Sequence, residues 1–252
     1  MGFDVAADAY DQFMGRWSRP LAPQLVEFAG VEAGHRVLDV GCGPGALTSE
    51  LVARVGASAV AAVDPSASFV KAAQERNPGV EVRLAGAEGL PFRDGTFDVA
   101  LAQLVVHFMA DPVAGLAEMA RVTRSGGVIA ACVWDFAGGH GPLGPFWLAA
   151  RALSPGVEDE SHLAGARQGH LTDLFRESGL RNIEDTSLSV TQTFAGFDEW
   201  WKGFMQGVGP AGSYLASLEA DGQVELREQC RAMLPAGSVT ITARAWAARG
   251  IS

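Results

Sequence analysis

The chain has 252 residues, a formal net charge of −10 and hydrophobic residues at 48% of its positions. This length suffices for one large α/β domain with a well-buried core, and we expect a single domain over residues 1–252. The acidic balance argues against nucleic acid as a substrate, because phosphate backbones are bound by basic surfaces. No apolar run approaches the ~20 residues of a membrane span, and no charged segment followed by an apolar stretch opens the chain. We therefore expect no membrane span and a cytoplasmic protein.

The chain contains three cysteines, Cys42, Cys132 and Cys230, and none belongs to a C-x-x-C pair. This number and spacing argue against a disulfide framework and against a zinc site. We predict no metal centre.

A helix is predicted near the N-terminus. Ser18 is a suitable N-cap with Pro20 in the first turn, apolar residues recur at helical spacing, and Gly30 ends the helix. Tyr10 and Arg16 precede it, close to Trp17. Either Tyr10 and Trp17 pack the helix onto the core, or Tyr10 and Arg16 lie at a ligand site.

The rest of the chain is organised around residues 37–48. A short apolar run that carries Asp39 stops at three alternating glycines, Gly41, Gly43 and Gly45, and a helix-compatible run follows. Glycines permit a tight turn with positive φ and allow a ligand to approach the backbone. The N-terminus of the following helix presents unpaired N–H groups and a positive dipole end. The pattern predicts a nucleotide-like ligand at the carboxyl end of a buried parallel strand.

This pattern also satisfies the G-x-G-x-x-G/A fingerprint of dinucleotide-binding proteins, from Gly41 to Ala46, with Asp64 at the end of the next predicted strand. In either case Asp64 is suited to ribose hydroxyls. Asp39 favours another ligand, because a carboxylate beside the loop repels a pyrophosphate and suits an ammonium or a sulfonium. An NAD-dependent oxidoreductase is therefore the weaker alternative.

Short strands and helices alternate as far as Trp134, and this alternation predicts a parallel, doubly wound sheet. Asp111 is the expected cap of one helix, with Pro112 at its first position. The predicted strands span 35–40, 58–63, 80–85, 97–102, 127–133, 182–194 and 239–246, and the predicted helices lie near 45–54, 66–76, 112–123, 145–153 and 168–178. Residues 197–234 are expected to form a helical insertion.

Five segments in order resemble the motifs of the class I S-adenosylmethionine (SAM)-dependent methyltransferases, in particular the small-molecule branch that includes quinone-biosynthesis and secondary-metabolite enzymes. The segments are Val37–Ala46, Asp64-Pro65-Ser66, Gly86–Phe92, Phe97-Asp98-Val99 and Gly126–Ile129. The resemblance is firm over about residues 8–135. It implies a Rossmann-like α/β fold with a seven-stranded sheet, mostly parallel with an antiparallel last strand. It also implies a substrate cap formed by helical insertions at about 136–170 and 197–235, SAM as cofactor and S-adenosyl-L-homocysteine as product.

The resemblance also assigns a cofactor site. The glycine loop holds the cofactor, and Asp64 accepts both ribose hydroxyls unless it only caps the next helix. Gln103 lines the methionine part, and the N-terminal Tyr10 and Arg16 reach its end. Cys42 is interpreted as a small packing residue of the loop. The residues assigned are Tyr10, Arg16, Asp39, Gly41, Cys42, Gly43, Pro44, Asp64, Pro65, Gly86, Ala87, Glu88 and Gln103.

Gly86 departs from the family pattern, in which Asp or Asn commonly reaches the adenine amino group. Glycine has no side chain for this contact, so adenine recognition is left to the Ala87 backbone, to Glu88 or to water.

Methyl transfer from a sulfonium is an in-line displacement, so the protein has to align the reactants and exclude water. His107 is the candidate catalytic base, because its unperturbed pKa lies near working pH. A histidine in an apolar run is otherwise a core residue, and His140 is a second candidate. Trp200, together with Trp201, Phe204 and Met205, either forms a core face of the cap or lines an apolar acceptor pocket.

The sequence thus predicts an enzyme that methylates a small, partly apolar molecule at oxygen, carbon or nitrogen. A methyltransferase-like protein that binds its ligand without activity is the alternative.

Overall fold

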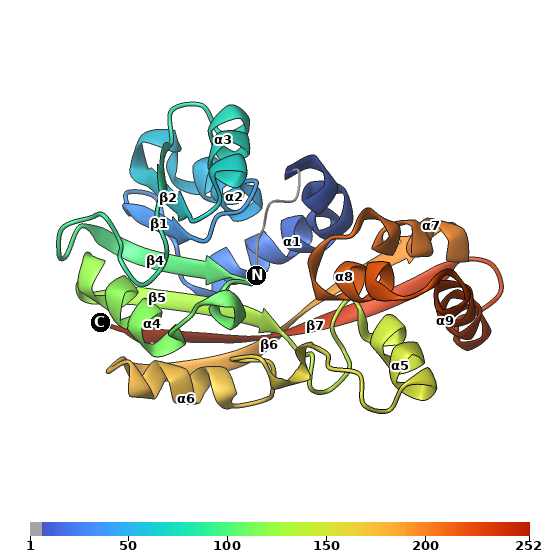
Figure 1. Cartoon of the computed structure of the whole chain (residues 1–252). Helices are drawn as coiled ribbons and strands as arrows, with labels where there is room; N and C mark the ends of the chain where they lie inside the picture. The colour runs from blue at the N-terminus through green and yellow to red at the C-terminus, as the bar shows by residue number, and fades with distance from the viewer. Residues whose placement is uncertain (1–6) are drawn as a thin grey trace.

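The structure is a computed structural model that describes residues 7–252, with side chains from residue 10 onward. A seven-stranded sheet crosses this part of the chain in the order β3-β2-β1-β4-β5-β7-β6 (Figure 1). The strands are β1 (Val37–Val40), β2 (Val60–Asp64), β3 (Glu81–Leu84), β4 (Phe97–Gln103), β5 (Thr123–Trp134), β6 (Arg181–Phe194) and β7 (Val239–Ile251). Strands β1 to β5 pair in parallel, and β7 is antiparallel to both of its neighbours. The predicted Rossmann-like sheet with an antiparallel last strand is confirmed.

Helices cover both faces of the sheet. One side carries α1 (Ala7–Phe28), α2 (Ala46–Val55) and α3 (Ala67–Arg76), and the other carries α4 (Pro112–Val122) and α6 (His170–Glu177) (Figure 1). Asp111 caps α4 as predicted, since its Oδ1 accepts a hydrogen bond from the Ala114 N–H at 2.9 Å. The predicted boundaries lie within a few residues of those observed, except that β5 begins earlier and β7 continues to Ile251.

The start predicted for the first helix is wrong. Helix α1 begins at Ala7, so Ser18 is not its cap but lies within it, and Pro20 is an interior residue. Because Pro20 has no N–H, the Arg16 carbonyl four residues earlier loses its helical donor. The Gln192 side chain of β6 donates to that carbonyl at 2.7 Å. A hydrogen bond from a residue distant in the sequence therefore replaces the helical hydrogen bond that Pro20 cannot donate.

The last two strands extend beyond the rest of the sheet. Residues 245–251 of β7 pair with β5, whereas residues 239–244 pair only with β6. This two-stranded ribbon reaches a group of helices that we call the cap (Figure 1). The cap consists of α5 (Gly144–Leu153), α7 (Phe197–Lys202), α8 (Gly209–Ser217) and α9 (Ala220–Met233). The 3-10 helices are η1 (Ala57–Ala59), η2 (Val106–Phe108), η3 (Glu160–His162) and η4 (Phe204–Gln206).

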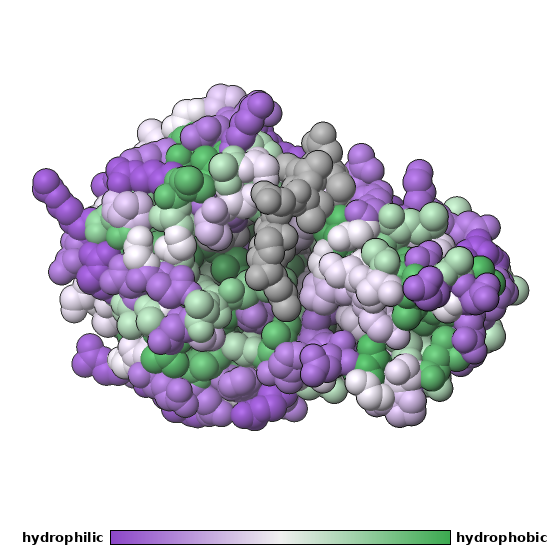
Figure 2. All heavy atoms as spheres, in the orientation of Figure 1, coloured by the Kyte–Doolittle hydropathy of each residue, from purple (hydrophilic) through white to green (hydrophobic). Residues whose placement is uncertain are grey.

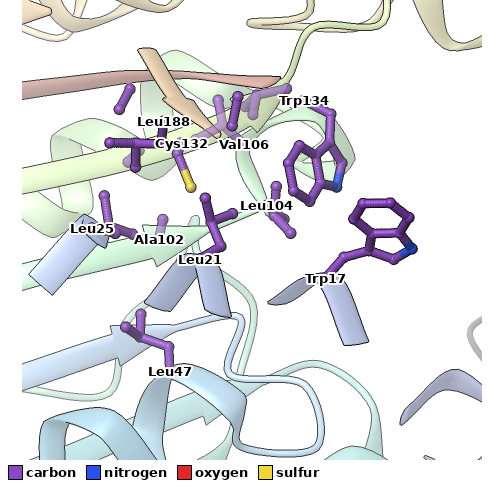
Figure 3. Packing of buried hydrophobic residues seen from close by; sticks show 14 of the residues in the cluster. Trp17, Leu21, Leu25, Leu47, Ala102, Leu104, Val106, Cys132, Trp134 and Leu188 are labelled. Carbon is purple, nitrogen blue, oxygen red and sulfur yellow. The ribbon is translucent and has the colours of Figure 1, made fainter. Parts of the chain in front are cut away.

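One part of the core lies between α1 and the sheet (Figure 3). Leu21 and Leu25 of α1 are fully buried. The Trp17 and Trp134 rings meet edge to face, with centroids 6.5 Å apart. Aromatic edge-to-face pairs add about 0.5–1.5 kcal/mol to the free energy gained by burial. Helix α1 is thereby fixed near the ends of β4 and β5, where the candidate site lies.

Candidate active site

The glycine loop after β1 is held by backbone hydrogen bonds. The N–H groups of Gly41 and Cys42 donate to the Val63 carbonyl at 2.8 and 2.9 Å. Gly41 has φ of +71° and Gly43 has φ of +52°. A Cβ at Gly41 would lie 2.5 Å from the Val105 side chain, whereas a Cβ at Gly43 would meet no atom within 4 Å. Close packing therefore requires the first glycine, and the second leaves the front of the loop open.

Asp64, at the end of β2, closes the loop from the other side. Its Oδ2 accepts from the Gly43 N–H at 2.9 Å and its Oδ1 from the Ser66 N–H at 2.8 Å. Burial raises the pKa of this carboxyl, and the two hydrogen bonds oppose that rise. Loss of this carboxylate would leave the Gly43 and Ser66 N–H groups without their acceptor. Each oxygen keeps a lone pair for a further donor.

Asp39 lies behind the loop. It is 1% exposed, and its Oδ2 accepts from the Thr48 hydroxyl of α2 at 2.6 Å. No donor in the described part of the chain reaches its Oδ1. Burial, reinforced by the nearby Asp64 charge, raises the pKa of Asp39 to about 7. Asp39 thus supports the loop from within the core.

A cavity of about 80 Å³, which we call the glycine-loop cavity, lies in front of the loop. Its lining includes six of the predicted cofactor residues together with apolar neighbours. The lining residues are Tyr10, Gly41, Gly43, Asp64, Pro65, Phe69, Gln103, Leu104, Val105 and Phe108. The structure therefore brings the N-terminal helix, the glycine loop and the ends of β2 and β4 to one site.

Gln103 carries an unsatisfied acceptor at this site. Its Nε2 donates to the Ser18 carbonyl at 3.0 Å, while its buried Oε1 has no donor among residues 7–252. A buried carbonyl without a donor costs about 1–3 kcal/mol. Such a group suits a ligand that carries N–H donors.

Arg16 is placed elsewhere. Its Nη2 lies 3.2 Å from Glu199 Oε1, and its guanidinium stacks over the Phe194 ring. It lines a separate cavity of about 310 Å³ next to the cap, which we call the cap cavity. Arg16 does not line the glycine-loop cavity, and its contact with the methionine end of the cofactor stays a prediction.

The segment predicted to recognise adenine lies beside the glycine-loop cavity without lining it. Ala87 is buried, and Glu88 Oε1 accepts from the Ala110 and Asp111 N–H groups at 2.8 and 3.3 Å. A Cβ at Gly86 would lie 3.3 Å from Glu88 Oε2. Glu88 is therefore engaged through one oxygen in fixing the start of α4.

The remaining loop residues have structural contacts. Cys42 is buried, and burial raises the pKa of its thiol well above the usual value, in agreement with a packing role. The Pro44 carbonyl accepts from Arg76 Nη1 at 2.7 Å, and Arg76 also pairs with Asp11. This arginine ties α3 to the glycine loop and to α1.

A second, mainly apolar cavity adjoins the first, and we call it the apolar cavity. The two share Tyr10, Leu104 and Phe108. Figure 2 shows apolar residues in a hollow of the sheet-bearing part of the molecule. The complete lining is Tyr10, Phe13, Met14, Leu104, His107, Phe108, Trp134, Phe136, Pro142, Leu143, Glu160, Val208, Gly209 and Pro210.

His107 lines the apolar cavity, and its ring contacts Phe108 and Phe136. Burial lowers the pKa of this imidazole to about 3, so the ring is neutral near pH 7. Its Nδ1 is buried without a hydrogen-bond partner in the described residues. A neutral imidazole with so low a pKa is a hydrogen-bonding group rather than an effective base.

Glu160 faces the same cavity, and the sequence analysis missed it. It is 4% exposed, and its Oε2 accepts from the Trp147 indole N–H at 2.8 Å. Its sequence context gives no signal, because the acidic run of residues 158–160 in a Gly/Pro-rich stretch is typical of a solvated loop.

The four aromatic and methionine residues predicted in the cap divide between two environments. Trp200, Trp201 and Phe204 are buried, whereas Met205 is 70% exposed. Trp200 and Phe204 also line the cap cavity. The core interpretation therefore holds for three of them, and two contribute a cavity wall as well.

His140, the second candidate base, belongs to an ion-pair cluster. Its Nδ1 lies 2.9 Å from Asp135 Oδ2, which also pairs with Arg244. Neither His140 nor Asp135 lines the glycine-loop, apolar or cap cavity. The cluster joins the end of β5 to β7.

Among the side chains that the structure describes, no group of three or more His, Cys, Asp or Glu is placed to hold a metal ion. None of the helices described is long and apolar enough to span a membrane.

Comparison with known proteins agrees with this geometry. Residues 38–131 match the model of a methyltransferase domain. An uncharacterized protein of Mycobacterium tuberculosis, Rv1403c, is 32% identical over 234 residues, which are 85% of this chain and 81% of that protein. A demethylmenaquinone methyltransferase of Renibacterium salmoninarum is 36% identical over 152 residues, which are 57% of this chain and 60% of that enzyme.

The fold is also that of solved methyltransferases. The geranyl diphosphate C-methyltransferase of Streptomyces coelicolor, solved with S-adenosyl-L-homocysteine, superposes with a TM-score of 0.56 at 15% identity, over 94% of this chain and 80% of that one. The chain belongs to the SAM-dependent methyltransferase family, as its ordered motifs predicted. The glycine pattern is thus the first motif of a methyltransferase, and the NAD-dependent alternative is set aside.

Proposed function

We propose that the chain binds SAM in the glycine-loop cavity and transfers its methyl group to a small, partly apolar molecule held in the apolar cavity. The observation that carries this proposal is that the two cavities share Tyr10, Leu104 and Phe108. A ligand of the first cavity can therefore meet a molecule in the second. When bound, SAM supplies an electrophilic methyl group, and the acceptor supplies the electron pair.

The residues around the glycine-loop cavity fit this cofactor. Gly43 leaves space in front of the loop, and Asp64 keeps lone pairs for ribose hydroxyls. The unsatisfied Gln103 Oε1 suits the ammonium group of the methionine part. We assign adenine recognition to the Ala87 backbone and to Glu88 Oε2, since Glu88 Oε1 is occupied. Tyr10 is assigned to closing the cavity from α1.

The apolar cavity fits an acceptor with a hydrophobic body. Aromatic rings such as Phe108, Trp134 and Phe136 line it, and they favour flat or lipophilic molecules. The net charge of −10 favours a small molecule over nucleic acid. We further propose a single functional domain over residues 1–252, of which residues 1–6 lie outside the described part. The three unpaired cysteines support a reducing compartment such as the cytoplasm.

Titration calorimetry with SAM and S-adenosyl-L-homocysteine tests the proposal. Asp64→Ala should weaken SAM binding by a factor on the order of ten to several hundred, because hydrogen bonds to a charged acceptor are worth about 1.5–3 kcal/mol each. The same change should lower the free energy of unfolding by about 1–3 kcal/mol, because the Gly43 and Ser66 N–H groups lose their acceptor.

Three outcomes would change this assignment. No SAM binding by the unaltered protein at millimolar concentration would contradict the proposed function. Tight SAM binding with no methyl transfer to a broad panel of acceptors would favour the inactive ligand-binding alternative. An Asp64→Ala protein that is destabilised yet binds SAM normally would restrict Asp64 to a structural role.

A further inference from the structure

The apolar cavity contains one carboxyl group without a charged partner. Glu160 belongs to the short η3 helix between α5 and α6, and it is 4% exposed. The nearest acidic residue, Asp159, pairs with Arg151 of α5 and accepts from the Ser161 N–H at 2.9 Å. In the described residues no Lys, Arg or His forms an ion pair with Glu160. A buried carboxyl that is not neutralised costs several kcal/mol, which argues for a role beyond packing.

Trp147 fixes the orientation of this carboxyl. Its indole N–H donates to Glu160 Oε2 at 2.8 Å, and both residues are buried. No protein donor in residues 7–252 is bonded to the other oxygen, Oε1. Glu160 lines the apolar cavity, and Oε1 keeps its lone pairs for a further donor.

The pKa of Glu160 is shifted toward neutral pH. Burial raises the pKa of Glu160 to about 7, the Trp147 hydrogen bond opposes this rise, and the Asp159 charge adds to it. The other ionisable groups around the cavity are His107 of η2, which burial keeps neutral near pH 7, and Tyr10 of α1, whose pKa burial raises to about 12. Arg151 is engaged by Asp159.

We propose that the acceptor is a neutral hydroxyl compound with an apolar, ring-shaped body, and that its O–H donates to Glu160 Oε1. This inference rests on the proposed function. The acceptor oxygen forms a bond to the methyl carbon while the carbon–sulfur bond breaks, its electron pair stays on sulfur, and the hydroxyl proton passes to Glu160. His107 lines the same cavity, and its buried Nδ1 has no partner in the described residues, so this ring is a second candidate for a hydrogen bond to the acceptor.

A hydroxyl compound fits this site better than an amine. A carboxylate holds an amine in its protonated ammonium form through an ion pair, and an ammonium has no electron pair for the methyl group. A neutral hydroxyl becomes a better nucleophile as its proton moves to the carboxylate. The aromatic lining of the cavity suits the ring of a phenol.

The test compares phenol with its methyl ether, anisole, which has the same ring and no O–H. Titration calorimetry is carried out on the protein saturated with S-adenosyl-L-homocysteine. We expect phenol to bind at least about tenfold more tightly than anisole at pH 8. The preference should shrink below about pH 7, where Glu160 takes up a proton. Glu160→Met should abolish the preference at every pH, and Asp159→Asn, which alters a neighbour outside the cavity, should retain it.

Methyl transfer provides the second readout. With labelled SAM and phenol, kcat/KM of the unaltered protein should rise with pH to a plateau above about 7, and Glu160→Gln should remove this rise. Equal affinity for phenol and anisole, or no binding of either at millimolar concentration, would overturn the proposal. A preference that survives in Glu160→Met would overturn it too. If S-adenosyl-L-homocysteine itself does not bind, the proposed function fails; if it binds and the phenol preference is absent, only the role of Glu160 fails.

Discussion

The glycine-loop side of the molecule and the cap side are built in different ways. On the glycine-loop side, the ends of the parallel strands β1, β2 and β4 and the loops after them form most of the site, since these ends lie at the same edge of the sheet. On the cap side, aromatic residues from distant segments pack together, such as Phe13, Phe146 and Phe204. Backbone hydrogen bonds therefore define the first region and side-chain packing the second. The two should respond differently to substitution.

Phe204→Ala should have the largest effect on stability. The Phe204 ring is 1% exposed, stacks on Phe146 at 4.6 Å and meets Trp200 at 4.8 Å. Removing a buried Phe side chain costs about 3–5 kcal/mol. We expect this loss in urea unfolding, with SAM affinity kept within about threefold. Met205→Ala is the matched control, because this neighbour is exposed and should change stability by no more than about 0.5 kcal/mol.

A fall in SAM affinity of more than about tenfold in folded Phe204→Ala would show that the regions are coupled. The coupling would run through α1, since Phe13 of that helix contacts Phe204 with ring centroids 5.4 Å apart.

Gly41→Ala should lower the free energy of unfolding by less than Phe204→Ala does, and it alters the glycine-loop side instead of the cap side. Its Cβ would meet the Val105 side chain at 2.5 Å on a backbone with φ of +71°. A left-handed backbone costs about 1–2 kcal/mol and overpacking about 1–3 kcal/mol, so we expect a loss of about 2–5 kcal/mol in urea unfolding. Gly41→Ala combined with Val105→Ala should recover the overpacking part.

Gly43→Ala is the matched comparison within the same loop. Its Cβ would enter open space, so only the backbone cost of about 1–2 kcal/mol applies. The methyl group would instead obstruct the ligand, and we expect SAM affinity to fall by about tenfold or more. Equal losses of stability in Gly41→Ala and Gly43→Ala would contradict the distinct roles of the two glycines.

The contrast between the two regions explains which parts of the structure could be predicted from the sequence and which could not. Alternating apolar strands, a glycine turn and caps such as Asp111 are local signals, and they determined the sheet, the order of its motifs and most of the glycine-loop cavity. Two features depend on contacts between segments that are separate in the sequence. One is the hydrogen bond from Gln192 to the Arg16 carbonyl, which allows α1 to continue through Pro20, and the other is the burial of Glu160 against Trp147. No spacing rule connects such partners.

Arg16 lies where the two regions meet, and its substitution should have the smallest effect on stability. Its guanidinium pairs with Glu199 of α7, and both side chains are partly exposed, at 33% and 44%. Such pairs contribute about 0.2–1 kcal/mol. Arg16→Gln should therefore lower the free energy of unfolding by no more than about 1 kcal/mol, and Glu199→Gln should do the same, because each change removes the same pair.

SAM affinity separates the two assignments of this arginine. If Arg16 serves the cap, both variants should bind SAM within about threefold of the unaltered protein. If it turns to the cofactor carboxylate when SAM binds, as the family resemblance implies, Arg16→Gln alone should lose about tenfold or more, since a charge-assisted fork is lost. Glu199→Gln would then bind SAM at least as tightly as before, because the competing carboxylate is gone, and this opposite response would assign Arg16 to the cofactor.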